Sequence, residues 1–102
     1  MLELRPNCEL CDRDLPPDST AARICTYECT FCADCVDRVL GNVCPNCGGG
    51  FEQRPIRPGR AWREDTGLVN DPAGVKRRHT PYTPDEIEAF VRALRDMPPH
   101  AR

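Results

Sequence analysis

The apolar positions near the C-terminus follow a helical spacing. They recur at intervals of three and four residues, at Ile87, Phe90, Val91 and Leu94. This spacing places them on one face of a helix. Thr83 suits the N-cap, Pro84 the first helical position, and Glu86 completes a capping box. The pattern therefore predicts an amphipathic helix over about residues 84–96, stopped by the prolines at 98 and 99.

The apolar positions of the first half are short runs interrupted by cysteines, charges and turn residues. The stretch from Ala33 to Leu40 predicts a two-turn helix closed by Gly41. Leu2 and Leu4 alternate with charged residues, which predicts a short strand. Residues 52–82 show neither the helical nor the strand spacing of apolar residues, and they are rich in proline, glycine and arginine. They therefore predict a mostly extended, flexible and solvated linker.

Composition separates the two halves of the chain. The 102 residues include eleven prolines, seven glycines and eight cysteines, and every cysteine lies between Cys8 and Cys47. About 50 residues bury too little apolar surface to fold stably without metals or disulfides. A large-core enzyme, a transmembrane protein and a long coiled coil are therefore excluded. We predict a small zinc-stabilised domain with little regular structure, with the domain at 1–51, the linker at 52–82, the amphipathic helix at 83–97 and a disordered tail at 98–102.

The first residues give no sign of a targeting segment. Met1 to Arg5 includes an acid at Glu3 and lacks the apolar core of a signal peptide, and no run of 18 apolar residues follows. We therefore expect a cytoplasmic protein without membrane contact, whose thiols stay reduced. This disfavours a disulfide framework. A redox dithiol is also disfavoured, because it would use only two of the cysteines.

The cysteines form four closely spaced pairs, Cys8/Cys11, Cys25/Cys29, Cys32/Cys35 and Cys44/Cys47. Two thiolates on one tight turn can reach a single ion at about 2.3 Å, and a second pair completes a tetrahedron. Eight thiolates therefore supply two structural Zn²⁺ sites with none left over. An iron–sulfur protein is the alternative, because the spacing from Cys29 to Cys35 repeats the start of a ferredoxin run. The eight-residue gap before Cys44 breaks that pattern.

Two pairings of these cysteines fit the spacing. The cross-brace of a RING finger gives Cys8, Cys11, Cys32 and Cys35 to the first zinc and Cys25, Cys29, Cys44 and Cys47 to the second. Tandem zinc knuckles would instead join the first pair to the second and the third to the fourth. We favour the RING-like cross-brace, because a 13-residue first loop and a helix after Cys35 are typical of it; the sequential pairing stays open.

Four motifs resemble one particular family. They are Met1 to Cys8, Cys11 to Pro17, Ile24 to Cys32 and Cys44 to Gly49. Together they look like an uncharacterised bacterial family, the domain-of-unknown-function family 1272. The resemblance covers residues 1–55 and implies a bacterial, zinc-binding protein, but it implies no activity.

The net charge of −2 conceals an uneven distribution. Residues 1–51 carry eight acids against four arginines, and residues 52–82 carry seven bases against four acids. The acidic domain would repel phosphate backbones. The linker instead offers a basic track of Arg54, Arg57, Arg60 and Arg63 beside Trp62, followed by Lys76, Arg77, Arg78 and His79. Such arginines can bind nucleic acid, keep a linker soluble or pair with the acidic domain.

These observations predict a binding protein and not an enzyme. Sites of four thiolates are closed, and His79 and His100 lie outside the cysteine pattern. We expect a structural zinc-binding module that mediates protein–protein interaction with an unknown protein partner, with its C-terminal helix at most loosely docked. Nucleic-acid binding through the linker is the alternative.

A RING-type ubiquitin ligase is disfavoured. Leu10 and Pro45 match positions that such ligases use. However, the second cysteine pair lacks their usual histidine, and Gly48 stands where many of them carry a basic residue.

Overall fold

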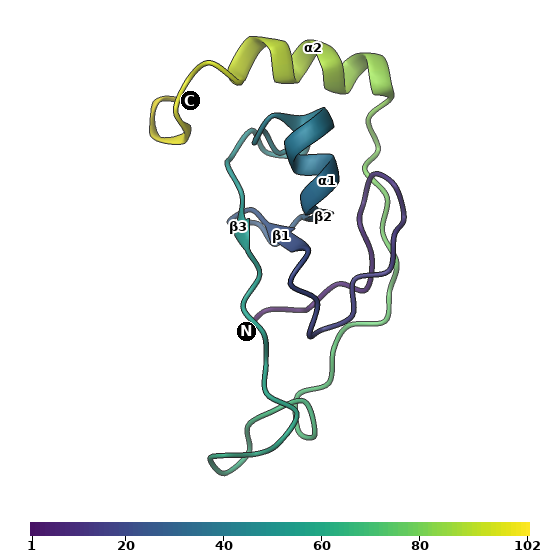
Figure 1. Cartoon of the computed structure of the whole chain (residues 1–102), viewed down its shortest axis with the longest axis vertical. Coiled ribbons are helices and arrows are strands. Elements are labelled where there is room, and N and C mark those ends of the chain that lie inside the picture. The colour runs from purple at the N-terminus through teal and green to yellow at the C-terminus, as the bar shows by residue number, and fades with distance from the viewer.

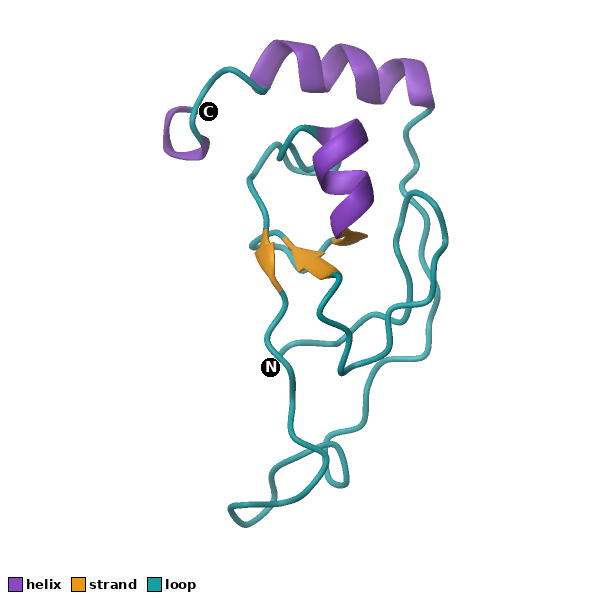
Figure 2. Ribbon diagram, in the orientation of Figure 1, coloured by secondary structure: helices purple, strands orange, loops and turns teal.

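Three short strands form the centre of the cysteine-rich domain. The computed structural model describes residues 1–102, and its sheet has the order β2-β1-β3 (Figures 1 and 2). β1 (Ala22–Ile24) pairs antiparallel with both β2 (Thr30–Cys32) and β3 (Glu52–Gln53). Its central residue, Arg23, stands opposite Phe31 in β2 and Gln53 in β3. The β1–β2 hairpin thus makes the residues on either side of its turn, including Cys25 and Cys29, neighbours.

A two-turn helix follows β2 directly, as predicted. α1 (Ala33–Cys35) continues into the π-helical turn η1 (Val36–Leu40). Gly41 ends this helix with a φ of 52°, a left-handed conformation that glycine adopts without steric cost. Cys35, Val36 and Leu40 are buried, so one face of the helix belongs to the core.

The hydrophobic core is small and depends on its cysteines. Phe31 and Phe51 meet edge to face, with ring centroids 5.5 Å apart and an interplanar angle of 73°. Leu15, Leu40 and Val43 are fully buried in the same cluster. Six of the 15 buried residues of this cluster are cysteines. So few aliphatic and aromatic side chains leave the domain dependent on whatever holds the cysteines together.

The C-terminal helix α2 (Pro84–Leu94) begins with the predicted capping box. The backbone N–H of Glu86 donates to Thr83 Oγ1 at 3.2 Å, and the backbone N–H of Thr83 donates to Glu86 Oε1 at 3.1 Å. The helix lies across the end of η1, at one end of the long axis (Figure 1). None of the helices is long and apolar enough to cross a membrane.

α2 packs on the domain more closely than its sequence predicts. Ile87 and Val91 are only 2% and 5% exposed and belong to the same core cluster as Leu40. Glycine allows this close approach, because a Cβ atom on Gly48 would lie 3.3 Å from Leu94 Cδ1. The expectation of a loosely docked helix is therefore corrected. The cysteine-rich domain has an apolar surface on which Ile87 and Val91 pack, and the spacing of residues in the sequence does not reveal it.

The segment 52–82 also differs from the flexible, solvated linker that its composition predicts. Arg54 is 2% exposed, and its guanidinium donates to the carbonyl oxygens of Arg5, Leu15 and Pro16 at 2.8, 3.1 and 3.0 Å. Arg57 likewise donates to the carbonyl oxygens of Leu2 and Asp71. These arginines satisfy backbone carbonyls in irregular segments, where no helix or strand ladder pairs them.

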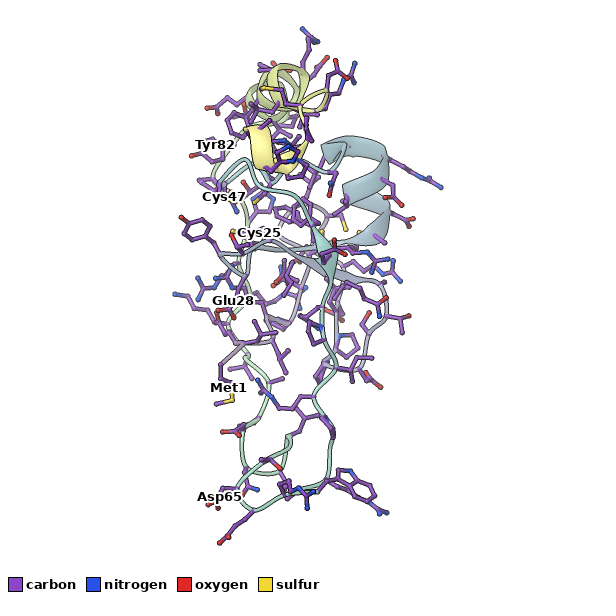
Figure 3. The ribbon with its side chains drawn as sticks, turned by 90° about the vertical axis from the view of Figure 1, so that its left-hand side faces the viewer. Met1, Cys25, Glu28, Cys47, Asp65 and Tyr82 are labelled. Atoms are coloured by element: carbon purple, nitrogen blue, oxygen red, sulfur yellow. The ribbon has the colours of Figure 1, made fainter.

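The segment then returns along the N-terminal region as an extended strap, residues 74–80. Its backbone N–H groups bond to that region at Gly74 with Glu3 O (2.8 Å), at Arg78 with Asn7 Oδ1 (3.1 Å) and at Thr80 with Glu9 O (2.8 Å). Between Arg57 and the strap, an exposed loop extends away from α2 to the opposite end of the molecule, where Asp65 lies (Figure 3). Only this loop resembles the solvated chain that was expected.

Two further expectations fail at the chain ends. Leu2 and Leu4 form no strand, because Leu4 is buried with a left-handed φ of 57°. The tail is not left free either. It forms a 3-10 turn, η2 (Pro99–Ala101), and Arg102 donates to the carbonyl oxygens of Asn42 and Gly48 at 2.9 and 3.0 Å.

Candidate metal centres

The first cysteine cluster joins the N-terminal loop to the end of the hairpin. The sulfur atoms of Cys8, Cys11, Cys32 and Cys35 all lie within 4.8 Å of one another. Cys11 Sγ and Cys32 Sγ are 3.8 Å apart. Sulfur atoms about 3.8 Å apart are expected in a tetrahedral site whose metal–sulfur bonds are about 2.3 Å. These four residues therefore have the spacing of a complete four-thiolate metal site.

A tight turn presents the first two of these thiols. The backbone N–H of Asp12 donates to Cys8 O at 3.0 Å, and that of Cys8 donates to Arg13 O at 2.9 Å. Asp12 completes the turn with a φ of 65°. Burial raises the pKa of the Cys8 thiol. A bound divalent cation would offset the cost of holding a thiolate there.

The second cluster lies beneath α2, where Cys25 and Cys47 are close together (Figure 3). The sulfur atoms of Cys25, Cys44 and Cys47 all lie within 4.8 Å of one another. Cys29 falls outside that limit for the whole set, but it is buried and lies on the same hairpin turn, where the Cys25 N–H donates to Cys29 O at 3.2 Å. Contacts from the Cys29 and Cys44 side chains lower the pKa of Cys25 to about 4, and contacts with Cys25 and Cys29 raise the pKa of Cys44.

Two backbone N–H groups donate to sulfur atoms of this second cluster. The N–H of Tyr27 donates to Cys25 Sγ and that of Gly49 to Cys47 Sγ, both at 3.4 Å. The turn between Cys44 and Cys47 is closed by the Gly48 N–H, which donates to Cys44 O at 2.7 Å. Gly48 has a φ of 82°, which few residues other than glycine adopt. Such N–H···S contacts stabilise thiolate charge.

The structure thus places the first cysteine pair with the third, and Cys25 of the second pair with the fourth pair. This is the arrangement of the RING-like cross-brace, since Cys8 lies with Cys35 and not with Cys25. The interleaving ties together segments that are far apart in the sequence. His79 and His100 belong to neither cluster. The donor set is sulfur alone, which suits zinc or iron and not magnesium or calcium.

Sequence reasoning missed the polar link between the two clusters. The carboxylate of Glu9, between Cys8 and Cys11, accepts hydrogen bonds from the Thr30 N–H at 2.6 Å and from Asn46 Nδ2 at 3.2 Å. Asn46 lies between Cys44 and Cys47, and its Oδ1 accepts from Thr80 Oγ1 at 2.8 Å. The sequence offered one signal, the acid between Cys8 and Cys11. An acid exposed to solvent at that position would give the same sequence, so the signal could not identify the link.

Comparisons with known proteins confirm the resemblance to one family. The family described as "Protein of unknown function (DUF1272)" matches residues 1–57. An uncharacterized protein of Rhizobium meliloti (strain 1021) is 57% identical over 77 residues, which cover 72% of this chain and 92% of that protein. That alignment is longer than the family match, so the similarity extends into the segment that wraps the domain. No solved structure matches the chain.

Proposed function

Because the chain belongs to the family of proteins of unknown function DUF1272, we propose its function from its own site: it is a structural zinc-binding module that mediates protein–protein interaction. Cys8, Cys11, Cys32 and Cys35 bind one Zn²⁺, and Cys25, Cys29, Cys44 and Cys47 bind the other. The observation that carries this proposal is the gathering of seven of the eight thiols into two separate, interleaved clusters, with the buried Cys29 on the same hairpin turn as Cys25. Zinc is favoured over iron because paired cysteines on tight turns are the usual ligands of structural zinc.

The coordination argues for a structural role of the metal. Four thiolates around one ion leave no position for water or substrate, so the ion cannot act as a Lewis acid. Cysteines make up much of the core, and each structural zinc contributes on the order of 10 kcal/mol to folding. The ions would therefore stabilise the fold of the domain, and residues on its outer surface would bind the partner.

The arginines favour a protein partner over a nucleic acid. Arg54 is buried, and Arg57 bonds to backbone carbonyls. Arg77 pairs with Asp12 and Asp14 at 2.9 and 2.7 Å. Much of the basic track of the sequence is therefore paired within the molecule. Its exposed remainder is Lys76 and the loop around Trp62, where Arg60 lies 5.7 Å from the ring. So small a basic surface gives little counterion release.

Metal analysis of the purified protein tests the metal assignment. We expect two zinc ions per chain, a colourless protein and eight cysteines shielded from alkylation, with unfolding of the domain on chelation. The Cys8→Ser/Cys35→Ser double variant should lose one ion, because both residues serve the same site. Cys8→Ser/Cys25→Ser should lose both. Iron with a visible charge-transfer band would overturn the zinc assignment.

A further inference from the structure

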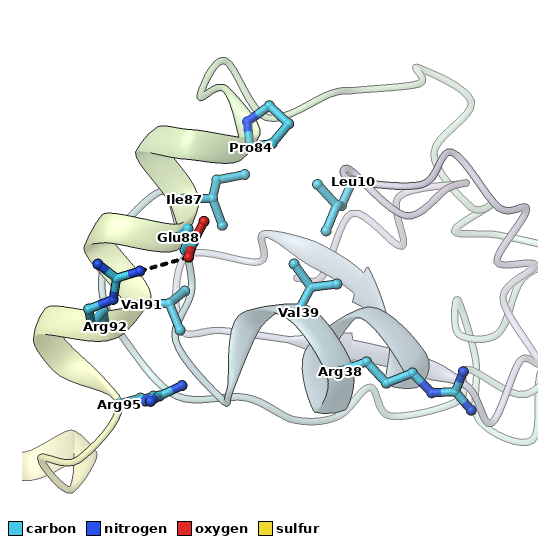
Figure 4. Close-up of a pocket in the computed structure, with 9 residues that line it drawn as sticks. All are labelled: Leu10, Arg38, Val39, Pro84, Ile87, Glu88, Val91, Arg92 and Arg95. Atoms are coloured by element: carbon cyan, nitrogen blue, oxygen red, sulfur yellow. Dashed lines mark hydrogen bonds and ion pairs between the residues drawn. The ribbon is translucent and has the colours of Figure 1, made fainter.

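A groove runs between α2 and the helix η1, with a volume of about 490 Å³ (Figure 4). Ile87 and Val91 line it from α2, and Leu10 and Val39 face them from the cysteine-rich domain. Pro84 closes the end near the start of α2. We call this site the α2–η1 groove. The groove forms only when α2 packs on the cysteine-rich domain, because residues from both line it.

The floor of the groove is apolar and partly open to solvent. Ile87 and Val91 are buried, Leu10 is half-buried and Val39 is 51% exposed. Val39 projects from η1 into the space between the two helices (Figure 4). An exposed valine beside a half-buried leucine gives a partner apolar surface to cover.

The rim of the groove is basic, in contrast to the domain that carries it. Three arginines line it, Arg38 on η1 and Arg92 and Arg95 on the α2 side. Arg92 pairs with Glu88, the one acid in the lining, at 2.7 Å. Arg38 and Arg95 form no ion pair. Residues 1–51 have twice as many acids as arginines, so an acid-poor rim here is a local reversal of charge.

We propose that the α2–η1 groove binds an acidic amphipathic segment of a partner protein, with apolar side chains against Leu10 and Val39 and carboxylates toward Arg38 and Arg95. The proposal rests on the proposed interaction function and names its surface and the chemistry of its partner. The groove volume is within the range of sites that take small ligands, about 300–1,000 Å³. It therefore accepts a short segment with a few side chains, and not the flat face of a folded domain.

A peptide selection on the zinc-loaded full chain tests this proposal. Random 12-residue peptides displayed on phage are selected on the protein, and the enriched peptides are synthesised and mapped by chemical-shift perturbation. We expect enrichment of Asp and Glu beside Leu, Ile or Phe, and shifts centred on Leu10, Val39 and Ile87. Affinity should fall as salt is raised, because the charges lie at an exposed rim.

Matched double variants separate the groove from general charge effects. Arg38→Gln/Arg95→Gln should weaken binding about tenfold, since two exposed ionic contacts are removed. Arg60→Gln/Arg63→Gln removes the same charge from the distant loop and should leave the affinity unchanged. Zinc content and the thermal midpoint should be the same in both variants.

Three outcomes would overturn the groove assignment: enriched peptides without acidic residues, perturbations mapped elsewhere, or equal effects of the two double variants. Peptides that bind another surface would leave the proposed interaction function standing. Absence of any enriched peptide would remove support for both. Loss of zinc binding would be seen independently, in the metal analysis.

Discussion

Glu9 Oε1 accepts a hydrogen bond from Asn46 Nδ2 across 3.2 Å, and this contact joins the turns that carry the two cysteine clusters. The other carboxylate oxygen of Glu9 accepts from the Thr30 N–H and from Arg5 Nη1 at 2.6 and 3.2 Å. Thr30 lies between Cys29 and Cys32, which belong to different clusters. One buried carboxylate thus links the Cys8–Cys11 turn, the Cys44–Cys47 turn and the strand between Cys29 and Cys32.

Glu9→Gln should therefore weaken metal binding at both clusters. The amide keeps the shape but turns one acceptor into a donor, which leaves a buried N–H without a partner at about 1–3 kcal/mol. Zinc competition against a chelator should show lower affinity at both sites. Glu88→Gln is the control, because its pair with Arg92 is exposed. A loss confined to one site would show that Glu9 does not link them.

Arg54→Met should destabilise the protein by about 3 kcal/mol, because the carbonyl oxygens of Arg5 and Leu15 lose their donor and that of Pro16 keeps only the Ser19 N–H. Burial lowers the pKa of Arg54, so the charge is held in a poorly solvated site. Urea unfolding of the zinc-loaded protein measures the change. Arg63→Met, in the exposed loop, should cost less than about 0.5 kcal/mol. Similar costs for the two variants would contradict an internal role for Arg54.

Ile87→Ala and Phe90→Ala test how α2 packs on the cysteine-rich domain. Ile87 is 2% exposed and Phe90 is 39% exposed. Ile87→Ala should lower the free energy of unfolding by about 2–4 kcal/mol, because it opens a cavity under the helix. Phe90→Ala should lower it by less than about 1.5 kcal/mol. Amide exchange across α2 should be slow in the wild type and fast in Ile87→Ala. Fast exchange in the wild type would mean that the helix is detached in solution.

Glu3 gives a prediction for pH. Hydrogen bonds from Arg5 and Arg78, at 3.1 and 3.0 Å, lower its pKa despite the opposing effect of burial. The ionised Glu3 therefore stabilises the folded state fully at pH values above its pKa in the unfolded chain, about 4.3. This stabilisation is lost as the pH falls through the lower pKa that Glu3 has in the folded state. Glu3→Gln should cost about 0.5–1 kcal/mol, because the pairs are partly exposed. That cost should be the same at pH 7.5 and 5.5, and a cost that shrinks between them would contradict a lowered pKa.

The sequence predicted the features that depend on neighbouring residues. The capping box of Thr83 and Glu86 and the helix closed by Gly41 are as predicted, because backbone geometry and hydrogen bonds within one turn decide them. The tight turn between Cys44 and Cys47 has the same local origin, and pairs of cysteines on such turns were expected from spacing alone.

Only the tertiary structure decided which of these local units meet. Spacing left two pairings of the cysteines open, and the path of the hairpin brings Cys8 to Cys35. Arg54 and Arg60 look alike in the sequence, yet one is buried among carbonyls and the other lies in the exposed loop. The packing of Ile87 in the core and the hydrogen bond between Glu9 and Asn46 also depend on contacts between distant segments. Contacts across tens of residues depend on how the whole chain closes, and no local pattern carries that information.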